Sequence, residues 1–309
     1  MLFSFGRSMA ASLPNLSRLL KRASKGDINA QFMLGLAFES GDGVAQDFAE
    51  AAHWYGKAAD AGSVVAQTHL GNLYAEGRGV ARDKTAAVRW YLRAAAEGDA
   101  AGQTNLGVMY FDGEGGLQRD YAEAAHWFLK AAVRHNPRAE ANLATLYLEG
   151  LGLPRDPDKA AELYLEAAKQ GNLYSQVRLA WMYEHGIGRP QDLAESLKWN
   201  RTASEHGYPP ALNNLGYLYE HGLGVPRDLA QAAQLYCEAA GRRLPEAQHN
   251  WAITNSNNKG LPRDCQEAAQ WLAKISGQGL RNSSDSIELG PEAQVGSSIM
   301  AGALGSERH

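Results

Sequence analysis

Residues 66–98 read AQTHLGNLYAEGRGVARDKTAAVRWYLRAAAEG, and this stretch decides the fold. A leucine and a glycine (Leu70-Gly71) are followed by two spaced glycines, by Asp83 and by an aromatic pair, Trp90-Tyr91. Glycine is favoured just after the end of a helix, and aspartate is favoured just before the start of one. The stretch therefore predicts two helices joined by a short loop.

The same stretch recurs along the whole chain. The leucine and its small neighbour return at Leu34-Gly35, Leu70-Gly71, Leu106-Gly107, Leu143-Ala144, Leu179-Ala180 and Leu215-Gly216, with Trp251-Ala252 in the seventh place. The aspartate returns at Asp47, Asp83, Asp120, Asp156, Asp192, Asp228 and Asp264, at spacings of 36 residues with one of 37. A fixed period of this length is typical of repeat proteins. We predict seven repeats over residues 28–279, numbered one to seven below.

Each repeat is expected to hold two helices and to need its neighbours. The glycines suit a left-handed cap after the first helix, and the aspartate caps the second, with Glu or Gln three positions later in five repeats predicting a capping box. In the second helices, alanines alternate with aromatic pairs such as Trp54-Tyr55. The rings of one helix can fill the space over the alanines of the next. Because a single pair would leave this face in water, the core is predicted to form between stacked repeats.

The unit A-x-x-x-L-G-x-x-Y-x-x-G-x-G-V-x-x-D-x-x-x-A-x-x-W-Y-x-x-A-A-x-x-G, almost complete from Ala66 to Gly98, resembles the Sel-one-like repeat, a branch of the tetratricopeptide superfamily. The resemblance covers residues 28–279. It implies an all-α, right-handed α-solenoid with a concave groove, and a non-enzymatic scaffold or adaptor that binds proteins. Two departures stand out: Asn200 replaces the second aromatic residue of repeat five, and residues 255–259 replace the tyrosine and first glycine of repeat seven.

The two ends of the chain lie outside the period. The first 26 residues hold five basic residues and no acidic one, and Leu16, Leu19, Leu20 and Ala23 stand at helical spacing. We interpret residues 1–27 as a capping helix of a cytoplasmic protein. A cleavable segment that targets the chain to mitochondria or for export is the alternative, because its composition suits one. Residues 280–309 lack aromatic residues and are predicted to be a disordered tail.

Composition excludes several classes of protein. With 45% hydrophobic and 21% charged residues, the chain has the composition of a soluble globular protein. A formal net charge of −4 offers no basic excess for binding nucleic acid, and no apolar run approaches the length of a transmembrane helix. Cys237 and Cys265 would be offset by about 12 Å along parallel neighbouring helices, so we expect no disulfide between them.

Candidate catalytic and metal-binding groups are few. His185 and His221 stand one repeat apart, but zinc needs three or four ligands and no further Cys or His shares their position. Ser256 and Lys259 fit the Ser-x-x-Lys pattern of penicillin-recognising enzymes, without the companion Ser-Asp-Asn and Lys-Thr-Gly triplets. We therefore predict no catalytic residue, no metal and no cofactor. A β-lactamase-like or cell-wall-fragment hydrolase, suggested by association with the family and by this one match, is the alternative function.

A polar row on the first helices is the candidate binding site. Counting each repeat's leucine as position 0, position −1 holds Met33, His69, Asn105, Asn142, Arg178, Asn214 and Asn250, and position +2 holds Leu36, Asn72, Val108, Thr145, Trp181, Tyr217 and Ile253. The two positions share one helix face, and first helices line the concave side in the superfamily. An asparagine amide both donates and accepts hydrogen bonds, which suits an extended peptide backbone. The competing interpretation is that these asparagines bond only between repeats.

From this row we predict a site for a protein or peptide segment. Trp181 and Tyr217 occupy equivalent positions of adjacent repeats and can hold one apolar side chain between them, while Arg178 can bind a carboxylate or a carbonyl. We expect a monomer that binds neither nucleic acid nor membrane. The predicted partner-binding residues are His69, Asn72, Asn105, Asn142, Arg178, Trp181, Asn214, Tyr217 and Asn250.

Overall fold

The computed structural model describes residues 16–242, 244–247 and 250. Thirteen α-helices can be bounded within these residues, residues 245–247 and 250 are helical as well, and the described residues contain no strand, which confirms the predicted all-α class. The chain divides into two compact units, the first ending at Arg155 and the second beginning at Asp156. Each unit is described by itself.

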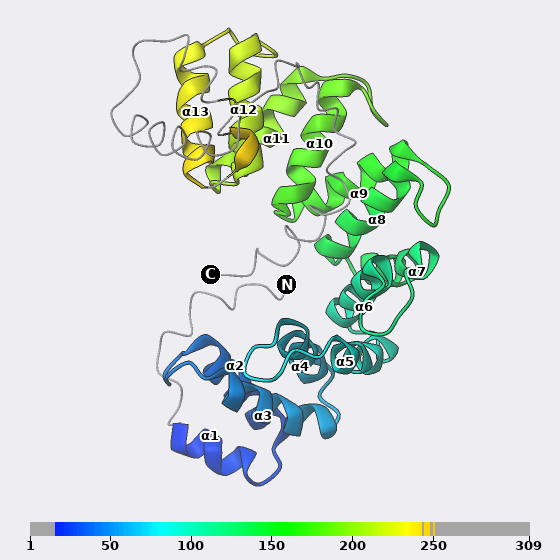
Figure 1. Cartoon of the computed structure of the whole chain (residues 1–309), viewed down its shortest axis with the longest axis vertical. Helices are drawn as coiled ribbons and strands as arrows, with labels where there is room; N and C mark the ends of the chain where they lie inside the picture. Colours follow the sequence, from blue (N-terminus) through cyan, green and yellow to red (C-terminus); the bar gives the residue numbers. More distant parts are fainter. Residues whose placement is uncertain (1–15, 243, 248–249, 251–309) are drawn as a thin grey trace, which may run out of the picture. The chain divides into compact units, whose positions relative to one another are not determined.

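The first unit is a stack of eight helices in which each helix packs against the one that follows it (Figure 1). The first helices of repeats one to four are α2, α4, α6 and α8, and the second helices of repeats one to three are α3, α5 and α7. The bounds are α1 Leu16–Ala23, α2 Ile28–Ser40, α3 Phe48–Asp60, α4 Val64–Glu76, α5 Lys84–Ala96, α6 Ala100–Asp112, α7 Tyr121–Ala132 and α8 Pro137–Glu149.

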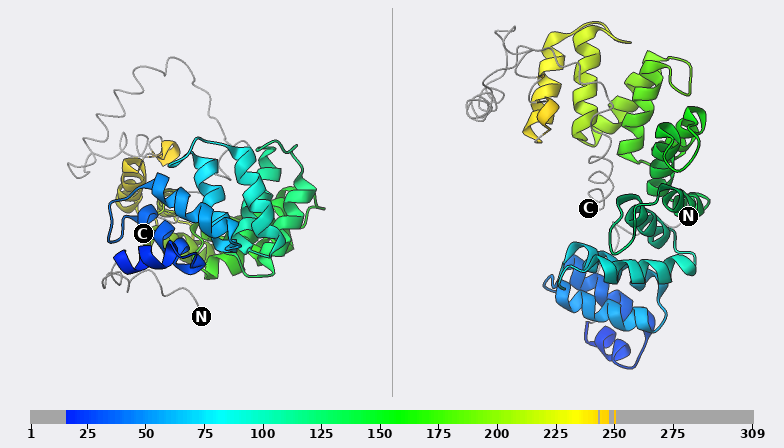
Figure 2. Two further views of the ribbon diagram at one scale, coloured as in Figure 1. Left: turned by 90° about the horizontal axis from the view of Figure 1, so that it is seen from below. Right: turned by 45° about the vertical axis from the view of Figure 1, so that its right-hand side comes forward.

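The second unit has the same arrangement, with helices that again pack in the order of the sequence (Figure 2). It begins with the second helix of repeat four and contains both helices of repeats five and six. The bounds are α9 Pro157–Lys169, α10 Leu173–His185, α11 Leu193–Glu205, α12 Pro209–His221 and α13 Leu229–Gly241.

The recurring aspartate caps the second helix of repeats one to six as predicted, but the capping box is incomplete. The side chain of Asp47 accepts hydrogen bonds from the backbone N–H groups of Ala49 and Glu50. The backbone N–H of Asp47 donates to the carbonyl oxygen of Phe38 in α2 instead of to Glu50. Asp83, Asp120, Asp192 and Asp228 repeat this bond to their own first helices. The prediction was wrong on this half of the motif because the loop brings a free carbonyl of the first helix closer than the glutamate.

The residue before each aspartate also ties the loop to the first helix. Arg82 Nε donates to the carbonyl oxygen of Ala75 at 3.1 Å, and Gln46 Nε2 donates to that of Glu39 at 2.8 Å. These side chains satisfy carbonyl groups that the end of a helix leaves without a partner. The same bond is made by Arg119, Arg155, Gln191 and Arg227.

In repeats one, two, three and six, the core holds an aromatic ring packed on the backbone of the first helix. Tyr55 of α3 lies against Gly35 of α2, so closely that a Cβ atom at residue 35 would overlap the ring. A Cβ atom at Gly71 would lie 2.6 Å from Tyr91 Cε1, and one at Gly216 would lie 2.8 Å from Tyr236 Cε1. The rings are fully or almost fully buried, which confirms the prediction that they form the core.

A loop glycine fastens each repeat to the one before it. Gly79 has a φ of 71°, in the left-handed region, and a Cβ atom there would overlap the backbone carbonyl group of Phe48 at the start of α3. Only glycine lets the loop of repeat two come this close to the second helix of repeat one. Gly152 meets Tyr121, and Gly188 meets Pro157, in the same way.

The helix α1 packs on the first repeat. Leu19 and Ala23 of α1 are buried in a cluster with Ala30 and Leu34 of α2 and with Trp54 of α3. Met33, the position −1 residue of repeat one, packs against this cluster. The α1 helix thus covers apolar surface that repeat one presents on its free side.

Cys237 is disulfide-bonded, so the expectation that the cysteines stay unpaired was wrong. The sequence contains one other cysteine, Cys265, which lies outside the described residues. The expected offset assumed that repeat seven continues the regular stack. That assumption is weakest in repeat seven, because its sequence lacks the tyrosine and the glycine that set the helix-loop register elsewhere.

We predict that Gly71→Ala lowers the free energy of unfolding by about 1–2 kcal/mol, because the added methyl group would press on the ring of Tyr91. Gly56→Ala is the matched control: Gly56 also lies inside a helix, but its added Cβ atom would meet nothing within 4 Å. We expect this control to raise the stability by up to about 1 kcal/mol through helix propensity. Urea denaturation measures both variants, and equal effects would contradict the proposed close contact.

Candidate functional site

The structure places the nine predicted site residues in two kinds of surroundings. We call positions −1 and +2 of the first helices the first-helix row. In the first unit, His69 and Asn72 are half-buried, whereas Asn105 and Asn142 are only 7% and 6% exposed. In the second unit, Tyr217 is 41% exposed, and Arg178, Trp181, Asn214 and Asn250 are half-buried. The side chains of the second unit therefore offer more surface to a ligand.

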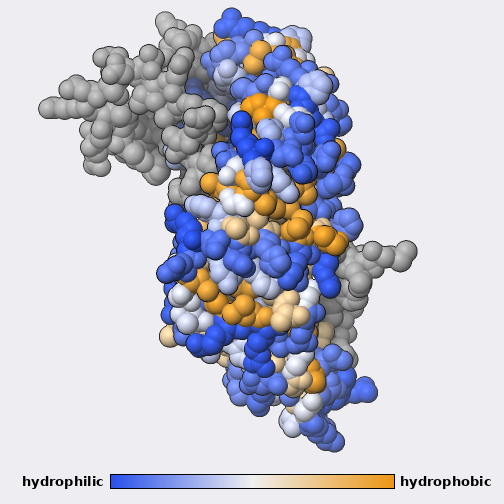
Figure 3. Space-filling view, turned by 90° about the vertical axis from the view of Figure 1, so that its right-hand side faces the viewer, coloured by the Kyte–Doolittle hydropathy of each residue, from blue (hydrophilic) through white to orange (hydrophobic). Residues whose placement is uncertain are grey.

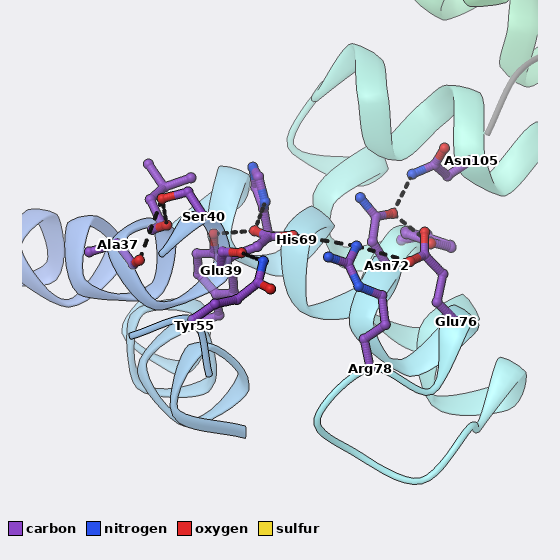
Figure 4. Close-up of polar contacts among 12 residues, drawn as sticks. Ala37, Glu39, Ser40, Tyr55, His69, Asn72, Glu76, Arg78 and Asn105 are labelled. Carbon is purple, nitrogen blue, oxygen red and sulfur yellow. Dashed lines mark hydrogen bonds and ion pairs between the residues drawn. The ribbon is translucent and has the colours of Figure 1, made fainter. Parts of the chain in front are cut away.

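Between repeats one and two, a carboxyl group connects three helices. Tyr55 Oη donates to Glu39 Oε2 at 2.6 Å, and Nδ1 of His69 contacts the same oxygen at 3.1 Å (Figure 4). Burial alone would raise the pKa of Glu39, but the bonds from His69 and Tyr55 outweigh it and hold the pKa below its ordinary value. Burial and the nearby Glu39 carboxylate raise the pKa of Tyr55. His69 is thus part of the contact between two repeats.

Between repeats two and three, an asparagine pair makes the corresponding connection. Tyr91 Oη and Asn105 Nδ2 both donate to Asn72 Oδ1, each at 2.8 Å (Figure 4). Burial raises the pKa of Tyr91, which keeps its hydroxyl group protonated as a donor. The side chains of Asn72 and Asn105 therefore bond to each other across the junction of two repeats. This agrees with the interpretation in which the asparagines connect repeats, the alternative to binding a peptide.

Asn142 breaks this series. Its Nδ2 is buried and has no hydrogen-bond partner in the described residues. The residue of repeat three that corresponds to Asn72 is Val108, which offers no acceptor. At 6% exposure, the Asn142 amide has little surface left for a ligand.

In the second unit, the row is aromatic and stacked on histidine. The ring of Trp181 lies 5.0 Å from that of His185, and the ring of Tyr217 lies 4.2 Å from that of His221. The guanidinium group of Arg178 lies over Trp181, 5.0 Å from the ring centre. These stacked pairs hold the two aromatic side chains in place while part of each ring stays accessible.

The junction of repeats five and six has lost the bonds seen at other junctions. Asn214, at position −1 of repeat six, makes no hydrogen bond with its side chain in the described part of the chain, whereas Asn250 Nδ2 of repeat seven donates to Asn213 Oδ1 at 2.9 Å. Glu184 corresponds to Glu39, yet no tyrosine reaches it, because Asn200 stands where Tyr55 stands in repeat one. Burial raises the pKa of Glu184.

Two further sets of side-chain hydrogen bonds between helices were not predicted from the sequence. Buried glutamines at position −3 donate through Nε2 to a carbonyl at the end of the preceding helix, and in two repeats the glutamate at position +5 accepts from the tyrosine of the same repeat. The return of glutamine at position −3 in most repeats was a signal that could have revealed the first set, whereas glutamate stands at position +5 in only three repeats and gave a weaker signal. The glutamines are Gln31, Gln67, Gln103 and Gln176, and the acid-tyrosine pairs are Glu39 with Tyr55 and Glu220 with Tyr236.

Groups suited to metal binding do not come together in the part of the chain described here. No cluster of three or more His, Cys, Asp or Glu side chains could hold an ion there. His185 and His221 each contact a carbonyl oxygen of their own helix, at 3.0 and 3.1 Å. Ser256 and Lys259 lie outside the described residues. None of the described helices has the length and apolar character needed to cross a membrane.

Comparisons with known proteins match this repeat pattern. The family described as Sel1 repeat matches seven segments, which confirms the seven predicted repeats: residues 28–63, 64–99, 100–132, 137–172, 173–208, 209–242 and 245–280. Among solved structures, the chain is similar to a protective antigen present in uropathogenic Escherichia coli strains that displays an SLR fold, with a TM-score of 0.69 and 34% identity over 86% of this chain. The match covers 57% of that antigen's chain.

A second similar structure is a Sel1 repeat protein from Oxalobacter formigenes, with a TM-score of 0.64 and 27% identity over 74% of this chain and 97% of that chain. No curated protein matches the sequence. The repeats and these structures together confirm the predicted fold class, an α-solenoid of Sel1 repeats.

We predict opposite effects for two equivalent carboxyl groups. At neutral pH, Glu39→Gln should lower the free energy of unfolding by about 1–2 kcal/mol, because it removes the charged acceptor of two hydrogen bonds. Glu184→Gln should leave stability unchanged or raise it slightly, because Glu184 pays for burial without a hydrogen bond. Urea denaturation measures both.

The effect of Glu39→Gln should depend on pH. Because the folded state lowers the pKa of Glu39, its contribution is complete above the ordinary value of 4.5 and is lost as the pH falls through the lowered value. The difference between wild type and Glu39→Gln should therefore shrink below pH 4.5. A difference that is constant from neutral pH to pH 3 would contradict the role given to the carboxylate.

Proposed function

Because the chain belongs to the Sel1 repeat family, whose members are typically protein-interaction scaffolds, we propose that it binds a segment of a partner protein along the first-helix row. The proposal includes the predicted concave groove and all nine predicted residues. Residues of the second unit contact the partner directly. In the first unit, His69, Asn72 and Asn105 hold neighbouring repeats together, while the buried amide of Asn142 has no such bond in the part of the chain that the structure describes.

The exposure of Tyr217 is the observation that supports this proposal most. In the described residues, Leu20, Ile28, Val65, Leu92, Leu129, Val133 and Tyr217 are the large hydrophobic side chains exposed to water. Of these, only Tyr217 lies on the first-helix row. Tyrosine and tryptophan are enriched where partners contribute most binding energy, and Trp181 occupies the equivalent position one repeat earlier.

The rest of the described surface has no large hydrophobic region on the face shown in Figure 3 that would by itself mark a binding site. On the face drawn in Figure 3, hydrophobic residues form small patches divided by hydrophilic ones. Patches of this kind are ordinary on soluble proteins, so hydrophobicity alone does not select a binding surface. The row is distinguished in the second unit by two aromatic rings and by Asn214, whose side chain makes no hydrogen bond in the described residues.

The remaining expectations about partners and chemistry belong to the same proposal. We expect a monomer without a cofactor, because the row needs neither a second copy nor a bound group to present its side chains. We expect no catalysis. The alternative, a β-lactamase-like or cell-wall-fragment hydrolase, depends on Ser256 and Lys259, outside the described residues, and no described contact favours it.

The compartment is part of the proposal as well. The sequence favoured the cytoplasm, with export or mitochondrial targeting as the alternative. The disulfide bond of Cys237 favours export, because disulfides persist in oxidising compartments and are rare in the cytosol. Mass spectrometry of the native protein, with and without reduction, reports both the disulfide and the mature N-terminus; a reduced chain that begins at Met1 would favour the cytoplasm.

We predict that Tyr217→Ala and Trp181→Ala each weaken partner binding by about 2 kcal/mol, the scale of a binding hot spot. The partner is first identified by affinity purification with the full chain and then titrated against purified variants. Thermal melts show whether each variant is folded, since a Trp→Ala change in a buried core would instead cost about 3–5 kcal/mol of stability.

Leu129→Ala is the control for these variants, because Leu129 is 51% exposed and lies on a second helix, away from the row. Its partner affinity should equal that of the wild type. Unchanged affinity in folded Tyr217→Ala and Trp181→Ala would place the partner elsewhere and overturn the proposal.

A further inference from the structure

The junction of repeats five and six is where the second unit leaves hydrogen-bonding capacity unused. At three described junctions, the residue at position −1 pairs with the preceding repeat: His69 with Glu39, Asn105 with Asn72, and Asn250 with Asn213. Asn214 has no such bond in the described residues, although it is only half-buried and holds a donor and an acceptor. Its amide is therefore available to a ligand.

Glu184 and Asn214 correspond to Glu39 and His69, which contact each other, and the carboxyl group of Glu184 makes no hydrogen bond in the described residues. In repeats one and six, a tyrosine hydroxyl donates to the glutamate at position +5, at 2.6 Å for Glu39 and 2.8 Å for Glu220. Repeat five keeps the glutamate, Glu184, but replaces the tyrosine with Asn200. Asn200 is fully buried and its Nδ2 donates to the carbonyl oxygen of Ser196, within its own helix α11. Glu184 consequently keeps its position and loses its donor.

The surroundings of Glu184 suit a cation. Trp181 lies three residues before it on α10, so the two side chains share a face, and Tyr217 occupies the equivalent position on α12. Both rings are partly accessible, and the face of an aromatic ring attracts a cation. A half-buried carboxylate that lacks a donor gains most from a charged one, because it has already lost water on one side.

We infer that the junction of repeats five and six binds a lysine or arginine side chain of the partner segment. This inference rests on the proposed function. The charged group of that side chain binds the carboxylate of Glu184 beside the rings of Trp181 and Tyr217, and Asn214 bonds to the backbone of the segment. Glu184 and Asn214 thereby become determinants of which segment is chosen.

Nearby side chains limit how a cation reaches Glu184. The guanidinium group of Arg178 lies over the ring of Trp181 and repels a second positive charge on that side of the ring. The rings of His185 and His221 lie against those of Trp181 and Tyr217, so only part of each aromatic ring is accessible. An extended side chain such as arginine or lysine can carry its charged group past these rings.

The test uses the full chain with its tryptophan indole groups labelled for NMR. The probes are the peptide Gly-Ser-Arg-Ser-Gly and its citrulline analogue, which has the same shape without the charge. We expect the arginine peptide to shift the Trp181 indole signal, identified by its loss in Trp181→Phe, and to bind about tenfold more tightly than the citrulline peptide. Equal binding of the two peptides, or no shift at Trp181 up to the solubility limit of the peptide, overturns the inference.

Two variants assign the preference to one carboxyl group. Glu184→Gln should remove the difference between the peptides, whereas Glu220→Gln, the equivalent change at a carboxyl group already paired with Tyr236, should preserve it. A preference for arginine that survives in Glu184→Gln also overturns the inference. The comparison of peptides on the wild-type chain decides the matter even if a variant fails to fold.

The peptide experiment and the partner titration can give different answers, so the inference and the proposed function can fail independently. If the partner loses affinity for Tyr217→Ala while the two peptides bind equally, the row is the binding surface and the inference about its chemistry fails. If the arginine peptide is preferred and the partner ignores Tyr217→Ala, the cation site is real and the partner binds elsewhere.

Discussion

The packing of one aromatic ring on one backbone determines the architecture of the repeats. The tyrosine or phenylalanine of the second helix packs closely against the glycine that follows the leucine of the first helix, as Tyr91 does on Gly71. This contact sets the distance between the two helices of a repeat. It also points the tyrosine hydroxyl group towards the end of the first helix, where Glu39 or Asn72 accepts its hydrogen bond. The polar contacts between repeats are built on that placement.

The stacking of repeats uses polar bonds as much as apolar burial. Buried glutamines reach back to the preceding second helix, and loop glycines let backbones come into contact. The carbonyl groups that the glutamines reach also accept a backbone hydrogen bond from the following loop, as Ala59 does from Gly62. These bonds recur in most of the described repeats, so a repeat that lacks one is easily recognised. In such a repeat, the side chains left without an internal bond can bind a partner.

Repeat five is the clearest exception. The change from tyrosine to Asn200 removes a ring from the core and a donor from Glu184, and the neighbouring Asn214 is unpaired as well. The same repeat carries Trp181 on its first-helix row, and repeat six carries the exposed Tyr217. The junction of repeats five and six therefore lacks a core ring and a hydrogen bond found in other repeats. It also carries the aromatic and polar side chains that we propose bind the partner.

The sequence alone determined the repeat period, the two helices of each unit, their aspartate and glycine caps and the aromatic core, because these depend on local spacing and on signals that recur seven times. It did not determine which asparagines pair with which residues. Asn105, Asn142 and Asn214 occupy the same position of the repeat pattern. Asn105 is bonded to Asn72 of the preceding repeat, the amide nitrogen of Asn142 is buried without a hydrogen-bond partner, and Asn214 is half-buried with no side-chain hydrogen bond in the described residues. Only the tertiary structure decided this, because the partner of each amide belongs to the neighbouring repeat and its identity changes along the stack.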